Sequence, residues 1–296
     1  MPTIRSWVQF PSPAPNQQVI INLFSNFSIF NDRIVLINFE LSLSMRFIEQ
    51  YLKKKFLYTE KSNPLKSLYY FVHRFYSRKG AINKSYTRHG LDLLVNWFFR
   101  NAQKGVYIDV GCWHPRWGNN TYLLHKRGWQ GINLDLDLNT IEMFKSFRPD
   151  DFNKRIAVSD KNGFEELYFY HNHSPINTIS KDIYEKRNTK TEVQKIPCQT
   201  LNSIVAETKF KDQKINYLDI DVEGHELSVL KGFDLQKYCP DVVTLEFLEK
   251  DIFLDNNINN IINSEIYKYM ISNHYKFVNW INSDLVFLRE DYYYSK

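Results

Sequence analysis

From residue 104 onward the chain alternates between short apolar segments and segments with helical periodicity. Apolar runs of about 4–8 residues are typical of buried strands, whereas apolar positions spaced three and four apart are typical of helices. The pattern predicts strands at 105–110, 131–136, 155–159, 165–170, 193–198, 215–221 and 241–247. It predicts helices at about 120–128, from 139, at 201–206, at 225–230 and near 258–273. Asn139 and Glu142 are spaced as a capping box for the helix from 139.

The last apolar segments, "KFVNWI" and "DLVFLR", are typical of a closing hairpin. Repeated alternation of strands and helices predicts an α/β fold in which a mostly parallel sheet has helices on both faces. The hairpin is expected to add an antiparallel edge to this sheet.

The first 103 residues do not show this alternation of strands and helices. Residues 1–44 show no steady period and form either an irregular extension or a region upstream of the true start at Met45. Residues 45–103 are predicted as a basic helical segment, with helices from Arg46, from Pro64 and near 88–102. Residues 45–88 contain eleven Lys and Arg but only two Glu, so the basic character of the chain is concentrated there. This segment either packs on the main domain with its basic face in solvent or contacts an anionic membrane.

Composition narrows the class of protein. Apolar residues make up 43% of the chain, which is enough for a sizeable core, and the three cysteines are too few and too scattered for a disulfide framework or a zinc site. The chain has no uncharged apolar run long enough to span a membrane and no signal-peptide pattern at its start. We therefore expect a cytoplasmic protein, with peripheral membrane contact through 45–88 as the alternative. Nucleic acid is not an expected partner because residues 89–296 are net acidic.

Candidate binding residues lie where the predicted strands end, since ligands of open α/β sheets bind beyond the carboxyl ends of the strands. Gly111 follows the first strand and allows close approach of the backbone to a ligand, and Asp135 ends the second strand. A carboxylate there can accept hydrogen bonds from both hydroxyls of a ribose. The chain has no glycine-rich phosphate loop, so a nucleoside cofactor without phosphate, such as S-adenosylmethionine, fits best.

Three carboxylates, Asp219, Asp221 and Glu223, stand two residues apart in "NYLDIDVEGHE". Side chains two apart on a strand point to one side, so these acids are expected to converge near the cofactor. Such a group can accept a proton or hold a hard cation. Acidic residues are also common at a helix N-terminus, which is the simpler explanation for Glu223.

The blocks "YIDVGCWHPRWGNNTYLLHKRGWQGINLDLD", "RIAVSD" and "INYLDIDVEGHELSVLKGF" resemble the FkbM family of S-adenosylmethionine-dependent methyltransferases over about residues 105–290. The resemblance implies a Rossmann-like seven-stranded methyltransferase sheet, with an antiparallel last strand, as the domain 104–296. It also implies transfer of a methyl group to a hydroxyl, often that of a sugar. The "CWHP" that follows Gly111 departs from the commoner family loop. The implied cofactor-binding residues are Asp109, Gly111, Cys112, Asp135, Ser159, Asp160 and Asp219.

The implied catalytic residues are Asp221, Glu223 and His225, one of which would act as a base toward the hydroxyl. A divalent ion on Asp219 and Asp221 is the less favoured way to activate that hydroxyl. Residues 171–180 form either a loop over the mouth of the site or an ordinary surface loop.

We therefore predict an O-methyltransferase for a glycan or another small hydroxylated acceptor, including a lipid-linked one. The alternative is a non-catalytic or membrane-surface binding protein that keeps the fold. The sequence does not indicate the oligomeric state.

Overall fold

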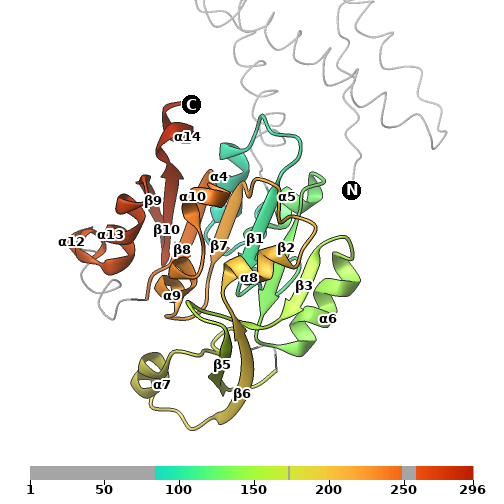
Figure 1. The fold of residues 1–296 in the computed structure, drawn as a ribbon, viewed down its shortest axis with the longest axis vertical. Helices are drawn as coiled ribbons and strands as arrows, with labels where there is room; N and C mark the ends of the chain where they lie inside the picture. The colour runs from blue at the N-terminus through green and yellow to red at the C-terminus, as the bar shows by residue number, and fades with distance from the viewer. Residues whose placement is uncertain (1–83, 173, 249–257, 296) are drawn as a thin grey trace, which may run out of the picture. The chain divides into compact units, whose positions relative to one another are not determined.

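A seven-stranded sheet is the centre of the described part of the chain (Figure 1). The computed structural model describes residues 84–172, 174–248 and 258–295. The strand order is β3-β2-β1-β7-β8-β10-β9, and all neighbours are parallel except those of β10, which is antiparallel to both β8 and β9. The strands are β1 (Val106–Val110), β2 (Gln130–Asp135), β3 (Phe152–Arg155), β7 (Tyr217–Ile220), β8 (Val242–Glu246), β9 (Tyr275–Ile281) and β10 (Asp284–Arg289).

Helices pack on both faces of this sheet because successive residues of its central strands point to opposite sides. Ile108 of β1 belongs to a core cluster that also contains buried residues of the helices α8, α9 and α13. Its neighbour Tyr107 belongs to a second cluster with α4 and α5. The helices are α4 (Leu91–Phe98), α5 (Tyr122–Lys126), α6 (Leu138–Phe147), α8 (Leu201–Ala206), α9 (Glu226–Lys231), α10 (Leu235–Tyr238), α12 (Ile258–Asn263), α13 (Glu265–Ser272) and α14 (Glu290–Tyr294).

A small second sheet lies at one end of the main sheet (Figure 1). Its order is β4-β6-β5, and its strands are β4 (Ala157–Val158), β5 (Gly163–Phe169) and β6 (Glu192–Gln199). The chain between β5 and β6 contains helix α7 (Lys181–Arg187). We call residues 163–199 the β5–β6 insertion.

The fold class predicted from the sequence is confirmed: a mostly parallel seven-stranded α/β sheet whose last strand is antiparallel. The hairpin prediction was wrong in one respect. The antiparallel strand β10 is not at the edge but is inserted between β8 and β9, so the edge strand β9 runs in the direction of the parallel strands.

Three local predictions also need correction. The strand expected at 155–159 is divided, because the chain pairs with β2 up to Arg155 and then pairs with β6 in the second sheet from Ala157. The N-cap of α6 is Asp137, whose carboxylate accepts from the backbone N–H of Asn139, so Asn139 does not form the predicted capping box. The helix expected near 258–273 is interrupted at Ser264, which caps α13.

The predicted helix near 88–102 corresponds to α4, whereas the predicted extension 1–44 and the helices from Arg46 and Pro64 lie outside the described residues. Within the described part of the chain, no helix combines the length and hydropathy needed to cross a membrane.

Gly111 joins the ends of β1 and β7. The backbone of Asp221 donates to the carbonyl of Val110 at 2.9 Å, which brings the loop after β7 against the loop after β1. A Cβ on Gly111 would lie 1.7 Å from the carbonyl oxygen of Asp221, and the residue has φ of 85°. The sequence suggested that this glycine makes room for a ligand, but the close neighbour is the protein's own backbone.

We expect Gly111→Ala to destabilise the protein by several kcal/mol, because it combines a positive φ with a backbone clash, and each of these effects costs roughly 1–3 kcal/mol. Gly128→Ala is a matched control, since Gly128 has φ of 86° but a Cβ there would have nothing within 4 Å. The control should cost only about 1–2 kcal/mol. Urea denaturation of both variants measures the difference, and equal losses would contradict this role of Gly111.

Candidate active site

A cavity lies beyond the carboxyl ends of β1, β2 and β7, where open α/β sheets bind ligands. Gly111, Asp135 and Asp221 line it from the three strand ends. Ser174, Pro175, Asn177 and Ile179 of the β5–β6 insertion form another wall. The loop at 171–180 therefore contributes to the site, as one of the two interpretations of the sequence expected.

Asp135, the last residue of β2, presents a carboxylate to this first cavity. Its Oδ2 accepts from the backbone N–H of Trp113 at 2.9 Å, and its Oδ1 accepts from that of Asp137 at 2.8 Å. A carboxylate has about four acceptor positions, so these two bonds fix its orientation and leave positions for two further donors. Burial raises the pKa of Asp135 to about 6, so it is mainly ionised at neutral pH.

Apolar side chains continue the cavity wall next to Asp135. Leu136, Ile156, Val158 and Ile179 line it, together with the indole of Trp113. A carboxylate with free acceptor positions beside an apolar slot suits a ribose joined to a flat base. The residues present therefore fit a nucleoside.

A second, more polar cavity adjoins the first and shares Trp113, Pro175, Asp221 and Glu223 with it. Its other lining residues come from five separate parts of the chain: Thr87, Arg88, His89, Leu91, Gly118, Asn120, Ile176, Glu246, Asn282, Ser283 and Asp284. This lining offers both hydrogen-bond donors and hydrogen-bond acceptors, which suit a polyhydroxylated ligand better than an apolar one.

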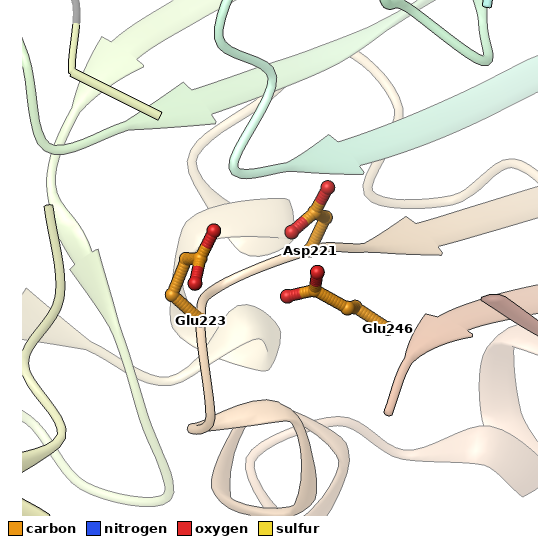
Figure 2. A group of neighbouring side chains, drawn as sticks. All are labelled: Asp221, Glu223 and Glu246. Atoms are coloured by element: carbon orange, nitrogen blue, oxygen red, sulfur yellow. The ribbon is translucent and has the colours of Figure 1, made fainter. Parts of the chain in front are cut away.

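Three carboxylates meet where the two cavities join (Figure 2). Asp221 and Glu223 follow β7, and Glu246 ends β8. One oxygen from each lies within 4.8 Å of the others, and Figure 2 shows the three side chains pointing toward one another. We call Asp221, Glu223 and Glu246 the carboxylate cluster.

The surroundings of the cluster disfavour its negative charge. Asp221 is open to the cavity but otherwise enclosed by protein, and this burial, with the nearby charge of Glu223, raises its pKa to about 8. Burial, together with the charge of Asp221, raises the pKa of Glu246 as well. Burial also raises the pKa of Glu223, although its ion pair with Arg187 of α7 opposes the shift.

Glu226 and the β5–β6 insertion fix the turn that carries Asp221 and Glu223. The Oε1 of Glu226 accepts from the backbone N–H of Val222 at 3.2 Å and from that of Gly224 at 3.0 Å. The hydroxyl of Thr178 donates to the carbonyl of Glu223 at 3.0 Å. Glu223 itself has φ of 56°, a conformation that surrounding contacts must maintain in a residue other than glycine.

Of the ten residues predicted from the sequence, four line the cavities: Gly111, Asp135, Asp221 and Glu223. Asp221 and Glu223 converge as expected, but Asp219 does not join them. Its carboxylate accepts from Asn120 at 3.0 Å and from the hydroxyl of Thr244. It therefore supports Asn120 in the second cavity and is not available to the cluster.

The other five residues lie elsewhere. Asp109 accepts from the side chains of Asn119 and Thr121, each at 2.8 Å, inside the protein. Cys112 packs in a core cluster of α6, and burial raises the pKa of its thiol. The remaining three lie around the start of α9: buried Ser159 contacts the Nε2 of His225 at 2.9 Å, and Asp160 is exposed beside them. None of the five lines either cavity, so the structure gives no support to direct contacts by their side chains.

Sequence reasoning missed Glu246, Asn120 and Arg187. A signal for Glu246 was present, because it is an acid that ends a buried strand, as Asp135 does. No comparable pattern marks Arg187, which reaches Glu223 only because the β5–β6 insertion folds over the site.

The model of the methyltransferase FkbM domain matches residues 102–277. The chain therefore belongs to the FkbM methyltransferase family, as the sequence blocks indicated. A search of the curated proteins found no significant match.

Two solved structures are similar to the chain at low identity. One is a TehB-like SAM-dependent methyltransferase from Corynebacterium glutamicum, with 13% identity, a TM-score of 0.34, and coverage of 77% of this chain and 100% of that one. The other is an O-methyltransferase from Bacillus cereus in complex with SAH, with 12% identity, a TM-score of 0.28, and coverage of 81% and 96%. The family assignment does not depend on these weak similarities.

We expect Glu226→Ala to lower the free energy of unfolding by about 2–4 kcal/mol, because it leaves two backbone N–H groups without their acceptor. Glu226→Gln keeps an acceptor oxygen and should lose clearly less. Chemical denaturation measures both values. Equal stability of the alanine variant and the wild type would show that Glu226 does not hold this turn.

Proposed function

We propose that this methyltransferase transfers the methyl group of S-adenosylmethionine to a hydroxyl of a sugar, a glycan or another small hydroxylated acceptor. The observation that carries the proposal is the carboxylate cluster at the junction of two cavities, one suited to a nucleoside and one lined by polar groups. A methyl donor and an acceptor held in these cavities would meet beside a group that can take a proton.

The first cavity supports this choice of methyl donor. Asp135 offers acceptor positions to the two ribose hydroxyls, and Leu136, Ile156 and Val158 offer an apolar surface to the adenine. When bound, S-adenosylmethionine supplies a methyl group on a positively charged sulfonium. The nearby carboxylates of Asp221 and Glu223 favour that charge.

Asp221 is the residue best placed to act as the base. It borders both cavities, and its pKa is high enough for effective proton acceptance near neutral pH. Glu223 is engaged by Arg187, and His225 contacts Ser159 outside the cavities, so both are weaker candidates. In the reaction the hydroxyl proton passes to Asp221 and the oxygen forms a bond to the methyl carbon. The carbon–sulfur bond breaks with its electron pair remaining on sulfur.

The acceptor cavity favours a polyhydroxylated molecule. Asn120, Asn282 and Ser283 provide neutral donors and acceptors. The acidic lining residues outnumber the one arginine, Arg88, and so disfavour a negatively charged acceptor. This chemistry is typical of sugar recognition and gives a reason to prefer a glycan over an acidic metabolite.

We expect Asp135→Asn to weaken S-adenosylmethionine binding about 100-fold, because two charge-assisted hydrogen bonds lose their carboxylate acceptor. Wild-type affinity should fall as the pH drops below about 6, where Asp135 becomes protonated, and the variant should lack this dependence. Titration calorimetry at several pH values measures both effects. Asp160→Asn is the matched control, because Asp160 is an exposed acid outside the cavity. An equal loss in this control would instead support Asp160 as a cofactor-binding residue, as the family resemblance implies.

We expect the enzyme, incubated with S-adenosylmethionine and a panel of glycosides, to release S-adenosylhomocysteine and to form a methyl ether. Mass spectrometry identifies the methylated product, and its stability to mild base distinguishes an ether from a methyl ester. Asp221→Asn should lower kcat by roughly 10²–10⁴-fold, the usual contribution of a general base. Cofactor binding without transfer to any hydroxylated acceptor would favour a non-catalytic binding protein.

A further inference from the structure

We propose that the carboxylate cluster binds one hard divalent cation, of the class of Mg²⁺, Mn²⁺ or Ca²⁺, and that this ion holds the acceptor hydroxyl. The cation site follows from the residues themselves, whereas its role toward the acceptor rests on the proposed function.

The geometry of the cluster suits an ion. Asp221, Glu223 and Glu246 each bring one oxygen within 4.8 Å of the other two. Oxygens bound to a common ion at about 2.1–2.5 Å lie at most about 4–5 Å apart. The cluster therefore needs little rearrangement to surround a cation, and Figure 2 shows its three carboxylates converging.

Glu246 gives a second, independent reason. The residue is only 9% exposed, and its Oε2 has no hydrogen-bond partner in the structure. Leaving a buried carboxylate oxygen without a donor is costly, so native proteins usually provide it with a donor or a metal ion. The proximity of Asp221 does not remove this cost, since Oε2 has no partner. An ion in the cluster would satisfy that oxygen.

The charge also matches a divalent ion. A bound cation would favour the ionised form of all three carboxylates, which then carry three negative charges, and the ion pair between Arg187 and Glu223 balances one of them. The remaining two equal the charge of one divalent cation. A sulfonium has a single positive charge and no position for carboxylate coordination, so it would balance the cluster only in part.

The ligand set selects the kind of ion. Ligands that are all carboxylate oxygens are typical of Mg²⁺, Mn²⁺ and Ca²⁺, whereas zinc and copper sites usually include nitrogen or sulfur. This set differs from the pair considered from the sequence, because Asp219 is engaged by Asn120 and Thr244 and its place is taken by Glu246.

The position of the site explains what the ion would do. All three ligands line the acceptor cavity, so the remaining coordination positions would face the acceptor. A hydroxyl bound to a divalent ion is more acidic than a free one. Its proton would pass to the carboxylate oxygen of Asp221 that does not coordinate the ion, and the hydroxyl oxygen would then bond to the methyl carbon as described above.

Titration of purified full-length protein with Mn²⁺ alone, followed by electron paramagnetic resonance, tests the site without any methyl transfer. We expect one bound Mn²⁺ per chain and a rise in melting temperature on binding. Glu246→Gln and Asp221→Asn should each weaken Mn²⁺ binding by about tenfold or more. The glutamine variant keeps the size and hydrogen-bonding capacity of Glu246, and circular dichroism verifies that each variant is folded.

Asp284→Asn is the matched control. Asp284 is an acidic residue of the same cavity that does not belong to the cluster, so its loss should weaken Mn²⁺ binding by about fivefold or less. Equal weakening in all variants would indicate general electrostatic attraction and overturn the cation site, as would Mn²⁺ binding that Glu246→Gln leaves unchanged.

Binding of S-adenosylmethionine in the presence of a chelator separates this inference from the proposed function. Cofactor binding without Mn²⁺ binding would overturn the cation site and leave Asp221 as an unaided base. Mn²⁺ binding without cofactor binding would overturn the proposed function and leave the cation site in place.

Discussion

The buried guanidinium of Arg148 is the interaction on which the cofactor side of the site depends. This side chain is 1% exposed and donates to the carbonyl of Pro115, the Oδ1 of Asn119 and the hydroxyl of Thr121. Asn119 and Thr121 in turn donate to Asp109 of β1. Burying a cation is costly unless it is paired and hydrogen-bonded, and these hydrogen bonds offset that cost. Because Pro115, Asn119 and Thr121 belong to the segment after β1, the same bonds fix the loop there. The position of Trp113, which lines both cavities and donates to Asp135, follows from that loop.

The carboxylate cluster has the opposite electrostatic character. Asp109 lies near the buried cation Arg148, whereas Arg187 is the basic group that pairs with the cluster, and its partner there is Glu223. Burial and the neighbouring acids raise the pKa values of Asp221 and Glu246, and the oxygen Oε2 of Glu246 has no donor. Acids buried without compensation reduce stability, so they are expected where a ligand supplies the missing charge. Asp109 and the carboxylate cluster, at the same edge of the sheet, thus have different roles: Asp109 stabilises the loop, and the cluster is suited to binding a cation.

The sequence predicted the sheet well because the local spacing of apolar residues indicates both the short strands and the helices between them. It predicted Asp135, Asp221 and Glu223 because a strand end is a local feature that can be located along the chain. It did not show which side of the strand Asp219 occupies in relation to Thr244, because that depends on the pairing of β7 with β8. The same limit applies to Asp109, whose partners Asn119 and Thr121 are arranged by Arg148, far along the chain. Contacts between distant segments decide whether an acid binds a ligand or another side chain, and periodicity does not encode them.

The β5–β6 insertion connects cofactor binding with the cluster. Its residues 174–179 form a wall of the first cavity, and its Arg187 and Thr178 hold Glu223. A Cβ on Gly224 would lie 2.4 Å from Ile183 of α7, so the turn after β7 packs closely against the insertion. A rearrangement of the insertion would therefore alter the contacts of Thr178 and Arg187 that hold Glu223. The position of Glu223 in the cluster therefore depends on contacts from the insertion. Sequence changes in the insertion would alter the acceptor site without changing the sheet.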